Sequence, residues 1–246
     1  MDLSYRHIRK ETTGSTNSDL AELCRREQVD DFTVISARRQ TAGRGQRGNK
    51  WESAPGKNLT FSIVVHPSFL EISRHFLISE IAALAVSDTL SRILPDISIK
   101  WPNDIYWHDM KICGILIENE IQGGLITQSL AGVGINVNQK EFLSDAPNPV
   151  SLLRATGREY SLDNILDNFV SRFACYYDCL KDGRYDEIKI KYLSSLYRRG
   201  TLHAFRDRHG IFHARIVDVL DHGPMALVDT DGQRREYMFK EVEYII

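Results

Sequence analysis

The stretch QTAGRGQRGNKW, residues 40–51, combines glycines and basic side chains in a pattern that suggests an anion-binding loop. Its basic residues and glycines are interleaved: Arg44, Arg47 and Lys50 with Gly43, Gly45 and Gly48. A guanidinium is a planar fork of hydrogen-bond donors that matches a carboxylate or a phosphate. Glycines let the backbone come close to a ligand. The stretch therefore predicts contact with an anion, and a solvated basic loop that contacts RNA is the alternative.

The three glycines fit the spacing of a dinucleotide-binding fingerprint, but the residues after them do not. In that fold the glycine loop opens a helix whose N-terminal N–H groups bind a pyrophosphate. Here NKWESAPGKN follows, and then a strand-like run. A P-loop needs Gly-Lys-Ser/Thr and a kinase loop needs V-A-I-K and H-R-D partners, and the sequence contains none of these. These three phosphate-binding motifs are therefore excluded.

A second group of polar residues lies in KWPNDIYWHDMKICGILIE, residues 100–118. Pro102 fixes a turn at the end of a strand and delivers Asn103 and Asp104 there. Lys111 begins the next strand, and small or apolar residues follow it, so its ammonium lies at the margin of a buried sheet. The side chain either reaches to water or holds a fixed positive charge beside a ligand.

A third signal is AGVGINVNQ, residues 131–139, an apolar strand interrupted by glycines. Glycine in a strand often marks a place where a ligand or another backbone approaches closely. Gly132 and Gly134 therefore predict space for a ligand against this strand.

The composition is that of a globular chain that buries a core, with 246 residues, 42% hydrophobic and 26% charged. The formal net charge of −2 gives no overall field that would recruit nucleic acid or a membrane, so anion binding must be local. The four cysteines form no C-x-x-C pair, and Cys175 and Cys179, one helical turn apart in an apolar stretch, are read as two buried core thiols. No apolar run is long enough to span a membrane or to act as a signal core. We expect a reduced, soluble, cytoplasmic protein.

Hydrophobic periodicity predicts alternating helices and strands before residue 198. Helices are expected after the caps at residues 15–17, at 69–94 before Pro95, and at 161–183 and 186–196; strands are expected at 32–37, 58–66, 97–101, 111–121 and 125–137. Gln122-Gly123-Gly124 predicts a hairpin between the last two strands.

The pattern changes near Thr201, where short apolar runs are separated by turn residues. Turns are expected at 209–210, 222–224 and 231–232, and the remainder is read as five short strands. Such a segment predicts a small β-barrel. We therefore divide the chain into residues 1–198 and residues 199–246.

Taken together, these motifs make the chain resemble the biotin protein ligases over about residues 12–246. The matching pieces occur in one order: GSTN (14–17), the QTAGRGQRGNKW loop, KWPND with the downstream Lys111, and the GVGIN strand. The resemblance implies an α+β catalytic domain, with a mixed, mostly antiparallel sheet backed by helices, followed by a small C-terminal β-barrel. The related lipoate-type acyl ligases share this fold but lack the glycine–arginine loop in this form. A non-enzymatic RNA- or protein-binding module is the alternative from another class.

The resemblance also implies a reaction, that of biotin–[acetyl-CoA-carboxylase] ligase. Biotin and ATP, accompanied by Mg²⁺, form biotinyl-5′-AMP, and the biotin is then transferred to a lysine of a biotin carboxyl carrier protein domain. Two anions must be brought together, so the protein must supply positioning and positive charge. No enzyme nucleophile is needed, because ATP supplies the activation.

Residue roles follow from the same resemblance. The biotin-binding residues are then Ser15, Thr16, Asn17, Gln40, Arg44, Gly45, Gln46 and Lys111, with Ser15, Thr16 and Gln40 on the ureido ring. The ATP-binding residues are Arg44, Arg47, Trp51, Asn103 and Asn136, where Trp51 could equally be a plain hydrophobic anchor. The catalytic residues are Lys111, Arg44 and Asp104, where Asp104 accepts the proton of the attacking amine or only shapes the turn. No protein-held metal site is expected.

Two departures from the family pattern qualify these roles. Many members carry Arg where this chain has Gln46, so one charge beside the adenylate is missing, and Arg44 and Arg47 are expected to hold the intermediate instead. Some relatives also have an N-terminal DNA-binding domain, whereas GSTN begins at residue 14 here, so no DNA binding is expected. An exposed sheet edge could pair with the carrier or form a weak homodimer. Glu118 and Glu120 are read as a solvated face.

Overall fold

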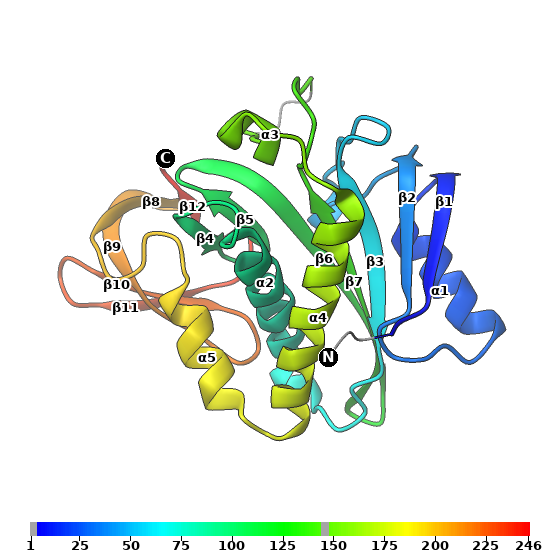
Figure 1. The fold of residues 1–246 in the computed structure, drawn as a ribbon. Helices are drawn as coiled ribbons and strands as arrows, with labels where there is room; N and C mark the ends of the chain where they lie inside the picture. The colour runs from blue at the N-terminus through cyan, green and yellow to red at the C-terminus, as the bar shows by residue number, and fades with distance from the viewer. Residues whose placement is uncertain (1–3, 144–147) are drawn as a thin grey trace.

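A seven-stranded sheet forms the centre of the protein in the computed structural model, which describes residues 4–143 and 148–246 apart from the side chain of Arg47 (Figure 1). Its strands are β1 (His7–Thr13), β2 (Val34–Gln40), β3 (Leu59–Val65), β4 (Ile97–Lys100), β5 (Asp104–Trp107), β6 (Met110–Gln122) and β7 (Leu125–Ile135). The order is β1-β2-β3-β7-β6-β5-β4, and every neighbouring pair is antiparallel except β1 and β2. The expected mixed, mostly antiparallel sheet is confirmed.

Helices cover both faces of this sheet. The long helices α2 (Phe76–Leu90) and α4 (Leu162–Lys181) pack side by side on one face, and α5 (Tyr185–Ser194) contacts both of them (Figure 1). On the other face lies α1 (Thr16–Arg26), which packs on β2, β3 and β7. The short α3 (Leu152–Thr156) follows the β7 segment. The face that carries α1 is left open beyond the helix, and the candidate site lies there.

The sequence did not predict β1, which runs parallel to β2 and connects to it through α1. Its residues HIRKETT contain a single aliphatic side chain, Ile8, because the strand is at the edge of the sheet and buries little. A mostly polar edge strand lacks the alternating apolar pattern that identifies half-buried strands.

The expected helix at 69–94 is shorter than predicted, since α2 begins at Phe76 and ends at Leu90. Just before α2, the backbone pairs with the β6–β7 hairpin. Glu71 pairs with Leu125, and Ile72 N–H donates to Gly124 O. This external pairing competes with the helix for the same backbone groups. Of the apolar residues in that segment, Leu70 is buried, whereas Phe69 and Ile72 remain exposed.

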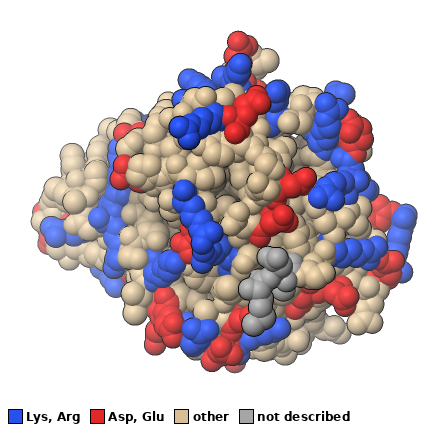
Figure 2. Space-filling view, viewed as in Figure 1, with Lys and Arg blue, Asp and Glu red and all other residues tan. Residues whose placement is uncertain are grey.

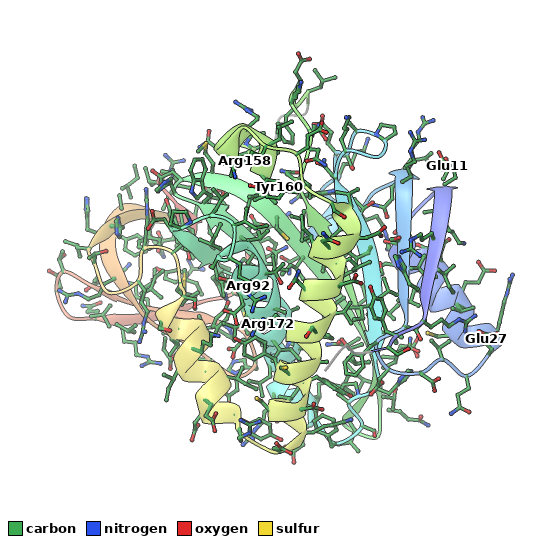
Figure 3. The ribbon with its side chains drawn as sticks, in the orientation of Figure 1. Glu11, Glu27, Arg92, Arg158, Tyr160 and Arg172 are labelled. Carbon is green, nitrogen blue, oxygen red and sulfur yellow. The ribbon has the colours of Figure 1, made fainter. Side chains whose placement is uncertain are left out.

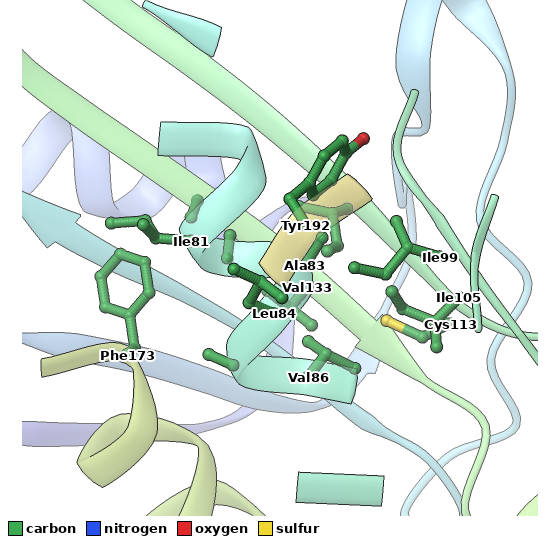
Figure 4. Close-up of a cluster of buried hydrophobic side chains, with 14 of the residues drawn as sticks. Ile81, Ala83, Leu84, Val86, Ile99, Ile105, Cys113, Val133, Phe173 and Tyr192 are labelled. Atoms are coloured by element: carbon green, nitrogen blue, oxygen red, sulfur yellow. The ribbon is translucent and has the colours of Figure 1, made fainter. Parts of the chain in front are cut away.

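The main hydrophobic core lies between the sheet and α2, α4 and α5. Figure 4 shows part of it, where Ile81, Leu84 and Val86 of α2 meet Val133 of β7 and Cys113 of β6. Nearly all of α2 is buried, because it lies between the sheet and the other two helices. A smaller cluster under α1 contains Leu20, Val29, Ile35, Val64 and Leu130.

The last strands form a second, five-stranded antiparallel sheet in the order β11-β10-β9-β8-β12. They are β8 (His203–Asp207), β9 (Gly210–Val219), β10 (Met225–Asp229), β11 (Arg234–Tyr237) and β12 (Glu243–Tyr244), with β11 and β12 at the edges. The main core continues into this sheet, and the Trp101 indole N–H donates to Gly223 O at 2.9 Å. The division at residue 198 stays a prediction.

The surface carries interspersed charges of both signs. Figure 2 shows blue and red side chains scattered among tan ones on the face that carries α2 and α4. Arg92 and Arg172 lie between these two helices in Figure 3, and Arg92 donates to Asn168 of α4 at 3.2 Å. Over the described ranges, no helix has the length and apolar character needed to cross a membrane.

Glu80 of α2 is a fully buried carboxylate in the core contact between α2 and α5. Its Oε1 lies 3.3 Å from Lys189 Nζ, while its Oε2 has no hydrogen-bond partner among the described residues. Lys189 also donates to Val219 O of β9. Burial raises the pKa of Glu80 to about 7, and the charge of Lys189 offsets only part of that rise.

We expect Glu80→Gln to remove part of the pH dependence of stability. Because the folded pKa is raised from 4.5 to about 7, the folded state binds more protons than the unfolded state between these values. The contribution of Glu80 to stability is therefore full below pH 4.5 and is lost as the pH rises through 7. Urea unfolding of both proteins across this window should show the wild type losing stability relative to Glu80→Gln. A constant difference between them would contradict this assignment.

Candidate functional site

A cavity of about 840 Å³ opens on the α1 face of the sheet. Segments that are distant in sequence form its wall: the start of α1, the glycine–arginine loop, β5, β6, β7 and the C-terminal segment from Phe239 to Ile246. Its volume lies within the ~300–1,000 Å³ range of small-molecule sites. The predicted site residues on the wall are Ser15, Thr16, Asn17, Gln40, Arg44, Gly45, Gln46, Trp51, Asn103, Asp104 and Lys111.

The start of α1 supplies a buried polar corner of the cavity. The Gln40 Oε1 accepts from Thr16 N–H at 2.8 Å and from Thr16 Oγ1 at 3.1 Å. Ser62 of β3 donates to Thr16 Oγ1 at 2.7 Å and also contacts Asn17 Oδ1. Gly132 makes room for this arrangement, since a Cβ there would lie 2.4 Å from Asn17 Oδ1. Short hydroxyl and amide groups held in this way suit a neutral polar ring.

The glycine–arginine loop folds back on itself as a small hairpin. Arg44 and Lys50 pair across it, Gly45 N–H donates to Asn49 O at 2.7 Å, and residues 46–48 form a 3-10 turn. The Arg44 guanidinium lies 3.1 Å from Glu118 Oε2, with about half of its side chain exposed. This carboxylate also accepts from Asn17 Nδ2 at 2.7 Å. Arg44 is thus placed to bind a carboxylate, and a carboxylate of the chain itself is its partner here.

A bulge places Lys111 inside the cavity. In the β5–β6 pair Asp104 faces Gly114 and Tyr106 faces Lys111, so one extra residue stands on the β6 side. Simple alternation would put Lys111 and Gly114 on opposite faces, and the bulge puts them on the same one. Lys111 Nζ forms an ion pair of 2.6 Å with Asp104 Oδ1, and both side chains are mostly buried. The backbone of Lys111 is also held on its other side by residues 148 and 150.

Gly114 and Gly134 lie opposite each other on β6 and β7 and form a flat floor. The indole of Trp51 lies on this floor, because a Cβ on Gly134 would be 2.3 Å from Trp51 Cε2 and one on Gly114 would be 3.1 Å from Cζ3. Trp51 Nε1 is buried without a hydrogen-bond partner in the part of the chain that the structure describes. The strand glycines therefore do create space, and an aromatic side chain of the loop fills it in this structure.

The cavity wall is electropositive. Its charged residues are Arg44, Lys50, Lys100, Lys111 and Lys240 against Asp104 and Glu243. Burial lowers the pKa of Lys100, an effect that the neighbouring Asp104 partly offsets. Lys100 Nζ lies 5.1 Å and 4.8 Å from the ring centroids of Tyr106 and Tyr244, so its charge is held between two aromatic faces. This excess of positive charge favours an anionic substrate.

The family model of the biotin/lipoate A/B protein ligases matches residues 10–136, which hold the α1 corner, the glycine–arginine loop, Lys111 and the glycine floor. The chain belongs to the biotin/lipoate A/B protein ligase family. A biotin–[acetyl-CoA-carboxylase] ligase of Paracoccus denitrificans is 30% identical over 233 residues, which cover 90% of this chain and 94% of that protein. The bifunctional ligase/repressor BirA of Bacillus spizizenii is 26% identical, over 94% of this chain and 71% of its own length.

A solved member of the family shows the same fold over nearly the whole chain. The biotin protein ligase from Aquifex aeolicus in complex with biotin and ATP superposes with a TM-score of 0.80 and 26% identity. The match covers 98% of this chain and 99% of that one, so it includes the C-terminal sheet. The family fold expected from the motifs is thereby confirmed.

Two of the predicted ATP-binding residues are not among the described residues that line the cavity. Asn136 follows β7 and is buried; its backbone N–H donates to Ile112 O and its carbonyl accepts from Leu152 N–H. The side chain of Arg47 lies outside the described residues. The individual roles of all the site residues stay predictions.

Sequence reasoning missed several residues that line the cavity or bind its wall. Lys100 directly precedes the WPND turn, so the motif itself could have indicated it. Glu118 was read as a solvated carboxylate, although it binds Arg44 and Asn17. Phe239, Tyr244 and the rest of the C-terminal segment gave no signal, because only the tertiary fold brings them beside residues 100–106.

The cavity wall offers carboxylates to a Mg²⁺ ion that would arrive with ATP. Within the described ranges no group of three or more His, Cys, Asp or Glu side chains could hold a metal. Mg²⁺ in nucleotide sites is commonly bound by one or two carboxylates together with the phosphates. Asp104, with its carboxylate on the cavity wall, is the residue that would contribute in this way.

Proposed function

We propose that this chain is an ATP-dependent biotin ligase that forms biotinyl-5′-AMP and transfers the biotin to a lysine of a biotin carboxyl carrier protein domain. The observation that carries the proposal is that Arg44 and Lys111 line the same cavity as a buried polar corner that suits a ureido ring. The family and its ligand-bound member support the same activity.

In the first half-reaction, a carboxylate oxygen of biotin bonds to the α-phosphorus of ATP, and pyrophosphate leaves with the electron pair of the broken P–O bond. Both reactants are anions, so their approach requires positive charge at the point of contact. Lys111, fixed by its bulge and by Asp104, supplies that charge from a rigid strand. Arg44, on the loop, exchanges Glu118 for the carboxylate of biotin and then for the adenylate phosphate.

The second half-reaction needs no further activation. The amine nitrogen of the acceptor lysine bonds to the biotin carbonyl carbon, and the C–O bond to phosphate breaks with its electrons on AMP. The ammonium must lose one proton before it attacks, and the new amide nitrogen loses another. Asp104 is the carboxylate beside the reacting centre that can accept a proton, provided that Lys111 releases it from their 2.6 Å ion pair.

The unpaired edge of β6 is the surface that we propose for the carrier. Pairing with β5 ends at Gly114, so residues 116–122 have only β7 beside them in the described structure. A free edge of this length can accept a strand from another chain. A carrier domain is the occupant favoured by the proposed activity, and a weak homodimer would use the same edge.

Binding of both substrates should stabilise the protein more than either substrate does alone. A tightly held adenylate shifts the folding equilibrium by mass action, since it binds only the folded state. We expect biotin plus ATP to raise the melting temperature by several degrees above the sum of the separate shifts. Lipoate plus ATP should give no such increase. An equal response to lipoate, or none to biotin with ATP, would overturn the proposal, and a mass shift of a carrier domain by one biotinyl group would establish the transfer.

A further inference from the structure

A second cavity of about 190 Å³ lies on the α2 side of the sheet, at the point where β5 diverges from β6. Ser79 of α2 and Ile117 and Asn119 of β6 are on its wall. Four residues line both this cavity and the main one: Gln46, Pro102, Asn103 and Ile115. The two cavities therefore adjoin around the edge of the sheet.

The size of the second cavity suits the end of a side chain and not a separate small ligand. Sites for small molecules usually exceed ~300 Å³. At the margin of this cavity the Ile115 N–H donates to Asn103 O and the Ile115 carbonyl accepts from Asn103 Nδ2, so Ile115 is the last residue of β6 whose backbone is satisfied from the turn before β5. The free edge of β6 begins immediately beyond it. A chain that pairs with this edge would thus lie at the mouth of the cavity.

Two acceptor atoms in this region lack partners. Oε1 of Gln46 and Oδ1 of Asn119 are buried and form no hydrogen bond within the described residues. A buried carbonyl oxygen without a donor is costly, so such atoms usually mark a place for water or for a ligand group. An ammonium carries three donors and no acceptor. The two acceptors without donors on this wall could therefore be satisfied by an ammonium, the group that ends a lysine side chain.

We propose that the second cavity is the passage by which the acceptor lysine reaches the adenylate, with Asn119 as a positioning residue for its nitrogen. The inference rests on the proposed function. The side chain would cross the β6 edge, donate to Asn119 Oδ1 and pass Gln46 and Asn103 into the main cavity. Gln46 then serves both substrates, because it stands between the passage and the predicted biotin site.

The test separates the two half-reactions. Ser79→Leu fills the cavity, and Asn119→Leu removes the acceptor; neither residue lines the main cavity. Each protein is assayed for biotin-dependent pyrophosphate exchange. Each is then loaded with adenylate, and single-turnover transfer is followed with two probes: the carrier domain of an acetyl-CoA carboxylase, and n-butylamine, which has the lysine side-chain length without a carrier to dock.

We expect both leucine variants to slow transfer to both probes about tenfold, with exchange within about twofold of wild type. Asn119→Asp retains an acceptor and should transfer within about threefold of wild type. Gln233→Leu, an exposed amide in the turn between β10 and β11, outside both cavities and away from the β6 edge, is the matched control and should transfer normally.

Several results would overturn the passage. A wild-type transfer rate in Ser79→Leu and Asn119→Leu would contradict it. An equal loss of pyrophosphate exchange and of transfer would also contradict it. Loss with the carrier alone, while n-butylamine reacts normally, would assign these residues to docking instead. Absence of exchange in the wild-type protein would refute the proposed function itself, which keeps the two failures distinguishable.

Discussion

Replacement of Lys111 by alanine is expected to lower the rate of adenylate formation about a thousandfold, the largest effect of any single side chain in the site. Lys111 is the cation that the strand framework holds most rigidly: a bulge turns it into the cavity, and residues 148 and 150 fix its backbone. Arg44 and Lys50 lie on a loop and are more exposed. A preorganised charge contributes more in a water-poor cavity than a mobile one, because it needs no reorganisation during the reaction.

The measurement is single-turnover formation of biotinyl-5′-AMP at saturating biotin and ATP. Lys111→Arg should recover little, since a guanidinium has a different shape and would displace the 2.6 Å contact with Asp104. Lys57→Ala is the matched control, because Lys57 is an exposed lysine outside the cavity, 3.9 Å from Glu159. If Lys111→Ala kept more than a tenth of the wild-type rate of adenylate formation, Lys111 would not be a catalytic residue.

The chemistry of the site could be predicted from the sequence because its residues are concentrated in short motifs. Arg44, Lys111 and the strand glycines each stand in a local pattern whose residue types point to an anion or to a close approach. The helices and hairpin with strong periodicity were also predicted, including the turn whose Gly123 and Gly124 have φ of 62° and 81°. Local sequence determines these features, so the sequence alone suffices for them.

What could not be predicted depends on contacts between distant segments. The face on which Lys111 lies is set by a bulge, and the sequence alone gives no sign of the extra residue. Tyr244 meets Lys100 only after the C-terminal sheet has packed against the cavity. The start of α2 is displaced because the β6–β7 hairpin binds the backbone at Ile72. In each case a long-range contact decides between conformations that are locally similar.

Gly134→Val is expected to have the second largest effect, a loss of at least a hundredfold in kcat/KM for adenylate formation. Valine is a good strand residue, so β7 should keep its pairing with β3 and β6. Its Cβ, however, would stand 2.3 Å from Trp51 Cε2, a distance that no relaxed structure accommodates. The indole must leave the floor formed by Gly114 and Gly134, and the valine methyl groups then occupy that space whether or not a ligand is present.

The cause can be assigned by a double-mutant cycle with Trp51→Ala. If steric conflict with the indole destabilises Gly134→Val, removing the indole should restore most of the lost unfolding free energy, because the two changes share one contact. Activity should not return, since the floor remains filled and the loop has lost its aromatic anchor. Additive losses of stability would show that the valine strains the strand itself. Wild-type kcat/KM in Gly134→Val would mean that the substrates do not use the glycine floor, and the nucleotide would then have to bind along the Lys100 and Tyr244 side of the cavity.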